Sequence, residues 1–340
     1  MVALRDVQRL AAALVMVCGS SSVMAQSLCV YDPAGASGDY YSMARDYQLQ
    51  AKTWGVTLSI QPYSDDSKLD ADFRAGKCDM ASMLGLRARE FNRFSGTLDA
   101  PGVLNNYAQV RLALNVLAQP QLARFMVDKG YETVGLIPVG AAYAVTNDRS
   151  INTWEHAAGK RIAVMSWDPV QTEAAREVGV VPVPTELGQF GPMFNTGKVE
   201  ILFAPMTLYK ALDMDQGVGT KGGIIRRPLA ELTMQYVTHR DRFPLDFGQH
   251  SRTFVASFTG RAIDNARHSE SQVDERLWLY AMHDQLDQWK IVMHGLRDHL
   301  AQEGVYDPRM LSVLQRVRCN SDPTDDECPA HNGTEQVSQR

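Results

Sequence analysis

The chain has 340 residues, with 34 Lys and Arg against 39 Asp and Glu, so its formal net charge at pH 7 is -5. This acidic balance gives no reason to expect nucleic acid as a partner, since proteins that bind nucleic acid carry an excess of positive charge. The length is typical of two domains.

The first 25 residues have the pattern of a secretory signal peptide. A positive start precedes a short apolar core, Leu10–Cys18, and small residues follow at the positions that a signal peptidase reads. We therefore expect cleavage after Ala25 and a periplasmic location. Cys18 offers lipidation as an alternative, but bulky Val17 precedes it where a lipidation site has Gly, Ala or Ser. No later stretch is apolar and long enough to predict a transmembrane helix.

The chain then alternates strands with helices. Residues 27–31, 56–63 and 78–84 are expected as strands, and residues 40–54 and 65–74 as helices. Such a βαβαβ unit has right-handed crossovers. Residues 107–129 follow as helix, with Pro120 starting a second helix, and residues 133–147 as a long extended run broken by Gly140.

A second α/β unit occupies residues 160–205. An apolar strand, Arg161–Val164, leads to Asp168, which can cap a helix that starts at Pro169. The next strand is Val199–Ala204, and Ile224–Val237 returns as strand. From residue 261 helix dominates: we expect one long helix from about 277 to 300 and a short one over 311–317, before a polar tail after Cys328.

Alternating strands and helices imply a mostly parallel sheet covered on both faces, in which ligands bind beyond the carboxyl ends of the strands. The loop Asp32–Asp39 feeds a helix N-terminus that could hold an anion or a polar group, unless Asp39 only caps the helix. Trp167 could stack on a ligand, or belong to the core. Glu186 is expected to cap the helix that follows it. The candidate ligand-binding residues at the strand ends are Asp39, Tyr40, Ser82, Met83, Trp167, Asp168, Met206, Thr207 and Tyr209.

Four cysteines remain after cleavage, and an even number in an oxidising compartment suggests two disulfides. Cys319 and Cys328 flank a short polar loop and are the simpler pair, which leaves Cys29 and Cys78 to join two early strands. Other pairings stay open. The spacing lacks paired Cys-x-x-Cys motifs, so we expect no metal site.

The segments FRAGKCDMASM, GKRIAV and FNTGKVEILFAP resemble those of the periplasmic solute-binding proteins of TRAP-type (DctP-like) transporters. The resemblance runs over roughly residues 27–310 and is stronger still to an AdeT-like subgroup, often labelled as aminoglycoside-efflux components. It implies a two-lobed periplasmic-binding-protein fold of type II, with two α/β lobes around a cleft and a long C-terminal helix that braces both. It also implies that Tyr143, on a strand that crosses between the lobes, contacts the ligand.

The resemblance divides the chain into a first lobe (26–147 and about 238–318), a second lobe (148–237) and a disulfide loop with a flexible tail (319–340). One departure concerns the ligand. The family's carboxylate-binding Arg corresponds to Ala163, so a carboxylate would need another arginine, such as Arg87 or Arg89.

We therefore expect a protein that closes around a small solute and delivers it to integral-membrane transporter subunits, without catalysis or a cofactor. An exported efflux-associated adaptor and an exported α/β enzyme are the alternatives. The enzyme alternative lacks a convergent nucleophile and base in the sequence.

Overall fold

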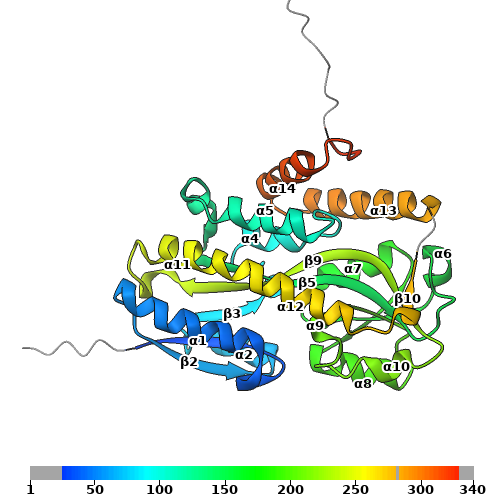
Figure 1. Ribbon diagram of the computed structural model, residues 1–340, viewed down its shortest axis with the longest axis horizontal. Coiled ribbons are helices and arrows are strands. Elements are labelled where there is room, and N and C mark those ends of the chain that lie inside the picture. The colour runs from blue at the N-terminus through cyan, green and yellow to red at the C-terminus, as the bar shows by residue number, and fades with distance from the viewer. Residues whose placement is uncertain (1–24, 281–282, 329–340) are drawn as a thin grey trace, which may run out of the picture.

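The computed structural model describes residues 25–280 and 283–328 and has two lobes that share one β-sheet (Figure 1). The strand order is β2-β1-β3-β9-β5-β8-β6-β7, with β4 and β10 paired to β5 and β9. The first lobe carries β1 (Gln26–Tyr31), β2 (Leu58–Tyr63) and β3 (Met80–Leu84). The second lobe carries β6 (Arg161–Met165), β7 (Val181–Thr185) and β8 (Ile201–Pro205).

Two long antiparallel strands, β5 (Tyr131–Thr146) and β9 (Gly223–His239), pass through both lobes. The sequence predicted that Gly140 breaks the first of these. Instead β5 continues through it, with a register shift between Pro138 and Gly140. Gly140 has a φ of 128°, and a Cβ there would lie 3.1 Å from the Cβ of Ala266. The glycine is therefore a local irregularity within a continuous strand.

The first lobe contains the two predicted helices, α1 (Asp39–Ala51) and α2 (Asp66–Arg74). Two short helices that were not predicted, α3 (Gly85–Ala88) and α4 (Arg93–Gly96), follow β3. A short 3₁₀ turn extends α1 to Gly55, which adopts the left-handed conformation that ends many helices. The region predicted as helix over 107–129 is α5 (Tyr107–Leu117), then a 3₁₀ helix that begins at Pro120, then β4 (Val127–Asp128).

The helices of the second lobe cover both faces of its sheet. They are α6 (Trp154–Ala157), α7 (Pro169–Glu177), α8 (Phe190–Asn195), α9 (Met206–Tyr209) and α10 (Asp215–Val218). Because side chains alternate along a strand, Ala163 and Met165 join the main core with Phe190, whereas Ile162 and Val164 face α7 in a separate small cluster. The second lobe thus has two interior compartments.

The C-terminal region contains α11 (Phe247–Val255), α12 (Thr259–Ser271), β10 (Trp278–Leu279), α13 (His283–Gln302) and α14 (Pro308–Ser321). The prediction of helix from residue 277 was wrong, because Trp278–Leu279 pairs with Ile224–Ile225 as a strand. The last helix is longer than predicted, since Asp307 caps it ahead of Pro308. No helix in residues 25–280 and 283–328 has the length and hydropathy needed to cross a membrane.

Helix α13 contacts both lobes, as the resemblance implied (Figure 1). Its Trp289 stacks on Trp154 of α6, with ring centroids 4.7 Å apart. Its Leu296 and Leu300 pack in the cluster that includes residues of α5 and α14. Helix α13 therefore connects α6 of the second lobe with α5 and α14, which pack on the first lobe.

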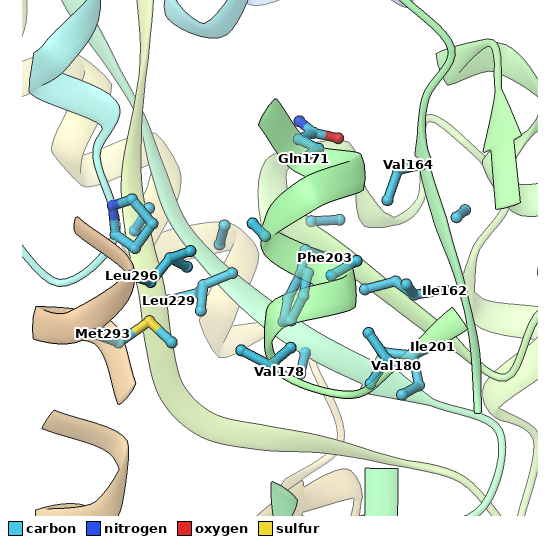
Figure 2. A pocket seen from close by; sticks show the side chains of 18 of the residues that line it. Ile162, Val164, Gln171, Val178, Val180, Ile201, Phe203, Leu229, Met293 and Leu296 are labelled. Carbon is cyan, nitrogen blue, oxygen red and sulfur yellow. The ribbon is translucent and has the colours of Figure 1, made fainter. Parts of the chain in front are cut away.

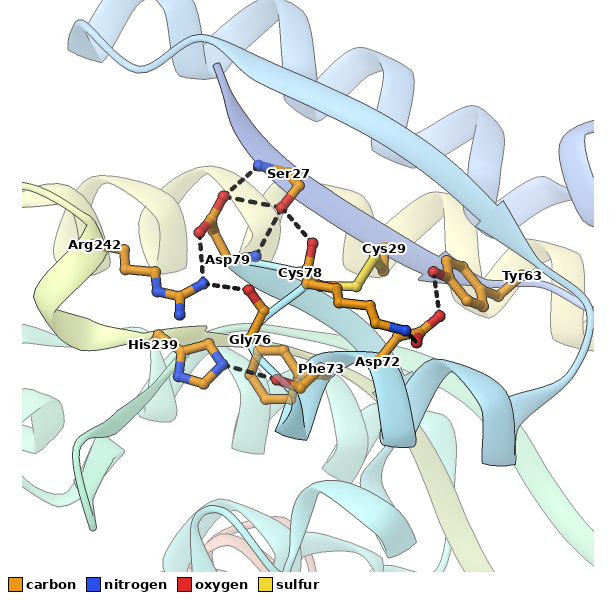
Figure 3. The surroundings of a disulfide bond; sticks show 11 residues. Ser27, Cys29, Tyr63, Asp72, Phe73, Gly76, Cys78, Asp79, His239 and Arg242 are labelled. Carbon is orange, nitrogen blue, oxygen red and sulfur yellow. Dashed lines mark hydrogen bonds and ion pairs between the residues drawn. A yellow bond between two sulfur atoms is a disulfide. The ribbon is translucent and has the colours of Figure 1, made fainter. Parts of the chain in front are cut away.

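Both predicted disulfides are confirmed: Cys29 pairs with Cys78, and Cys319 with Cys328. The first joins β1 to the residues just before β3 (Figure 3). Beside it, Asp79 accepts hydrogen bonds from the Ser27 amide (2.7 Å) and from Arg242 (2.7 Å). This group fixes the two central strands of the first lobe. Cys319 lies within α14, so the predicted loop starts later than residue 319, and residues 329–340 of the predicted tail lie outside the described residues.

Candidate functional site

The two lobes meet in a polar contact region, which we call the seam. It is formed by Ser67, Arg87 and Arg89 of the first lobe and Trp167, Asp168 and Glu186 of the second. Its contacts link side chains 79 to 119 residues apart in the chain. Ser67 Oγ donates to Glu186 Oε2 at 2.5 Å, and Ser166 donates to the other oxygen of Glu186. The predicted helix cap by Glu186 is wrong, because its side chain makes these contacts instead.

A buried ion pair lies in the seam. Arg89 Nη2 is 2.9 Å and 3.0 Å from the two carboxylate oxygens of Asp168. Asp168 is 2% exposed and also accepts from the amide of Val170, so it is the N-cap of α7 as the sequence allowed. One carboxylate thus starts a helix of the second lobe and binds an arginine of the first.

Next to this ion pair, the guanidinium of Arg87 stacks on the ring of Trp167, 3.8 Å from its centroid. Asp66 holds Arg87 through two hydrogen bonds of 3.1 Å and 2.7 Å. Burial raises the pKa of Asp66, and the charge of Arg87 opposes that rise. Trp167 therefore contacts a charged group of the opposite lobe, and it is only partly buried.

The helix N-terminus that the sequence marked as an anion site binds a carboxylate of the protein itself. Asp32 accepts hydrogen bonds from the amides of Ala34 (2.9 Å), Tyr40 (2.9 Å) and Tyr41 (3.2 Å). Burial raises its pKa, and these amides counteract the rise. Asp39 is exposed and accepts from Asn265 of α12. Asp32, at the end of β1, therefore accepts the hydrogen bonds at this helix start that were expected to go to Asp39 or to a ligand.

The remaining predicted residues lie on both sides of the seam. Ser82 and Met83 are fully buried in β3, and Met206 and Tyr209 are buried in α9. Thr207 donates to the carbonyl of Val139 at 3.0 Å. Burial raises the pKa of Tyr40, and the hydroxyl of Thr207 in the other lobe lowers it.

Three of these predicted residues keep a buried polar atom that has no hydrogen-bond partner among the described residues: Ser82 Oγ, Trp167 Nε1 and Tyr209 Oη. Burial also raises the pKa of Tyr209 to about 12. Nine other buried polar atoms of the described residues also lack a partner, so these three are candidates for ligand contact because they lie near the strand ends where a ligand was expected.

Tyr143 belongs to a different group of side chains, where β5 and α12 meet. Its hydroxyl and that of Tyr107 donate to the same oxygen of Glu270, at 3.0 Å and 2.5 Å. Glu231 on β9 is 4% exposed, and its Oε2 has no partner among the described residues. Burial, together with the charge of Glu270, raises the pKa of Glu231 to about 8, so this carboxyl is protonated at neutral pH.

No arginine of the seam is free to bind a carboxylate. Ala163 offers no charge, and Arg161, the exposed first residue of the same strand, pairs with Glu200. Arg87 and Arg89 are already paired within the protein. A carboxylate ligand would have to displace Asp66 or Asp168.

A largely apolar cavity of about 190 Å³ lies beneath α7 (Figure 2). Ile162, Val164 and Phe203 form its floor on the sheet, and Met293 and Leu296 of α13 close one side.

This cavity was not predicted from the sequence. Its walls carry small side chains on both layers: Ala142 and Ala144 on β5, and Ala174 and Ala175 on α7. These alanines were the only indication of a cavity that the sequence offered, and they come together only in the tertiary structure. The cavity reaches the seam at Arg89 and Asp168, and Asp168 is the one predicted site residue in its wall.

Comparison with known proteins gives a consistent result. The family model described as "Solute-binding protein AdeT 1/2" matches residues 52–333. A relative from Acinetobacter baumannii named "Probable solute-binding protein AdeT1" is 39% identical over 300 residues, which cover 88% of this chain and 98% of the relative.

Solved structures with similar folds are TRAP periplasmic solute-binding proteins. One from Roseobacter denitrificans, with bound β-D-glucuronate, has a TM-score of 0.68 at 15% identity and covers 85% of this chain and 98% of its own. Another from Shewanella oneidensis, with bound succinate, has a TM-score of 0.66 at 15% identity and covers 86% and 98%. At this identity the likeness concerns the fold.

Proposed function

The chain belongs to the AdeT 1/2 family of solute-binding proteins, and we propose that it captures its solute by closing its two lobes at the seam. The buried ion pair between Arg89 and Asp168 carries this proposal. Buried ion pairs contribute little net stability, because the desolvation of both charges offsets their attraction. A polar seam of this kind can separate in water, whereas an apolar one would hold the lobes permanently together.

The solute is a polar molecule that is uncharged or cationic. In the seam and at the neighbouring helix start, the carboxylates of Asp32, Asp66, Asp168 and Glu186 outnumber the guanidiniums of Arg87 and Arg89. The three orphaned polar atoms of Ser82, Trp167 and Tyr209 supply neutral hydrogen-bonding groups. An anionic solute of the kind bound by the solved relatives would meet repulsion here.

In this proposal the mature chain starts at Gln26 in the periplasm and hands its solute to integral-membrane transporter subunits. The moving parts are residues 26–147 with about 238–318, and residues 148–237. The solute favours the closed form only through its higher affinity for that form. The protein performs no chemistry on the solute and needs no cofactor.

Native mass spectrometry of protein purified from its own periplasm tests the proposal. We expect an additional small mass that is lost when the protein is unfolded and refolded. Once that molecule is identified, Trp167→Ala should weaken its binding at least tenfold in isothermal titration. Trp54→Ala is the matched control, because Trp54 packs on Phe247 within the first lobe. Equal affinities of wild type and Trp167→Ala would remove Trp167 from the site.

A further inference from the structure

We propose that the cavity beneath α7 is a second binding site, which takes a small molecule with an apolar body and one anionic group. It adjoins the seam at Arg89 and Asp168 but differs from it in chemistry. The cavity lies mainly between α7, α13 and the middle of the second lobe's sheet, and Leu84 and Pro101 of the first lobe also line it.

The apolar body follows from the size and lining of the cavity. Its volume of about 190 Å³ is close to that of engineered apolar cavities that stay dry and bind benzene, about 150 Å³. Ile162, Val164, Ile201 and Phe203 present hydrocarbon and ring surface from the sheet, and Val178 does so from the end of α7 (Figure 2). A benzene ring with a short branched substituent matches this space.

The anionic group follows from Arg227. This residue lies on β9 in the cavity wall and is partly buried. No side chain or carbonyl among the described residues accepts a hydrogen bond from it, and desolvation lowers its pKa with no opposing carboxylate. A guanidinium that is partly removed from water without a partner gains a two-point contact from a carboxylate or sulfonate.

The adjacent Arg226 shows what a paired arginine looks like on the same strand. It is exposed, donates to Glu275 at 3.1 Å and to the hydroxyl of Tyr280 at 2.7 Å, and stacks on Trp278. Arg226 therefore forms its hydrogen bonds outside the cavity, whereas Arg227 forms none with the described residues. The two side chains provide a matched pair for mutation.

An entrance to the cavity lies between α13 and the end of α7. A surface groove there is lined by Trp154, Val178 and Leu296, which also line the cavity, and by Ile291. Trp154 and Trp289 stack across this entrance at an interplanar angle of 20°. A rotation of Trp289 about its side-chain bonds would widen the opening without moving the sheet.

Isothermal titration of the full-length mature protein with 4-isopropylbenzoate, and with the neutral 4-isopropylbenzyl alcohol, tests the proposal. We expect one benzoate per chain. Arg227→Gln should weaken benzoate binding at least tenfold and leave the alcohol's affinity unchanged, whereas Arg226→Gln should change neither. Ala174→Phe, which fills the cavity from α7, should abolish binding of both compounds while the melting temperature is kept or raised.

Trp167→Ala should leave the affinity for the benzoate unchanged, so that failure of the seam proposal and failure of this one are separable. The proposal is overturned if neither compound binds at millimolar concentration. It is also overturned if Arg227→Gln binds the benzoate as well as Arg226→Gln does. If Ala174→Phe misfolds, Ala144→Leu from the opposite wall provides the same blocking test.

Discussion

The seam and the cavity beneath α7 adjoin each other at Arg89 and Asp168, yet they are built in opposite ways. In the seam, Arg89 pairs with Asp168 and Ser67 with Glu186 across the two lobes, and Arg87 stacks on Trp167, so a solute must replace contacts that the protein already makes. In the cavity, largely apolar walls enclose the space, so a ligand would gain contacts without breaking an ion pair. The comparison teaches that the polar contacts between the lobes lie in the seam, whereas the cavity beside it is bounded mainly by apolar side chains from both lobes.

The largest expected effect comes from removing the charge in the seam. In the solute-bound, closed form, Asp168→Ala leaves Arg89 buried without a partner and should lower the free energy of unfolding of that form by about 3–5 kcal/mol, with about 1 kcal/mol of that from the lost helix cap. Urea denaturation measures this loss. Asp168→Asn separates the two parts, because the amide oxygen still caps α7 but carries no charge. If Asp168→Asn were as stable as wild type, the ion pair would not be closed in the resting protein.

The second prediction compares the cavity with a filled part of the core. Val30 on β1 and Val164 on β6 are both buried strand residues, 0% and 3% exposed. Val30→Ala should cost about 2–3 kcal/mol, the transfer of two methyl groups plus a new cavity, while Val164→Ala should cost only about 1 kcal/mol because Val164 lines the cavity and its truncation adds little to it. Equal losses in denaturant titration would mean that the cavity is filled in solution.

The third prediction concerns pH. The pKa of Glu231 is raised to about 8 in the folded chain, above its ordinary value, so the folded state binds the proton more tightly than the unfolded state. This contribution is greatest below the unfolded-state pKa and is lost as pH rises through the folded pKa, and the total change between pH 6 and pH 8 is about 2 kcal/mol. Glu231→Gln should flatten this slope relative to wild type. An identical pH dependence in wild type and Glu231→Gln would contradict the assignment.

Local signals in the sequence predicted most of the fold. Glycines at the helix ends, such as Gly55, and the Asp168-Pro169 pair at the start of α7 act within a few residues, so they can be read without tertiary structure. The strand Trp278–Leu279 could not, because it exists only through its pairing with Ile224–Ile225, more than fifty residues earlier.

The candidate site was predicted less completely, for the same reason. The sequence placed Trp167 and Asp168 at a strand end, but not the partners Arg87 and Arg89, which reach them from the other lobe. Nor did it reveal the isolation of Arg227, since an arginine without a partner is defined by what surrounds it. The sequence therefore predicted that Trp167 and Asp168 belong to the site, whereas their contacts with Arg87 and Arg89 could be found only in the folded chain.

The central claim is that the lobes close at the seam around a solute, and a distance across the seam tests it most directly. Lys68 on α2 and Gln189, just before α8, are both exposed and can be replaced by cysteine for spin labels. Electron–electron resonance should show a mixture of longer distances in protein freed of solute by unfolding and refolding. Adding the solute that co-purifies should shift this mixture to one short distance. The same distance distribution with and without solute would contradict the account.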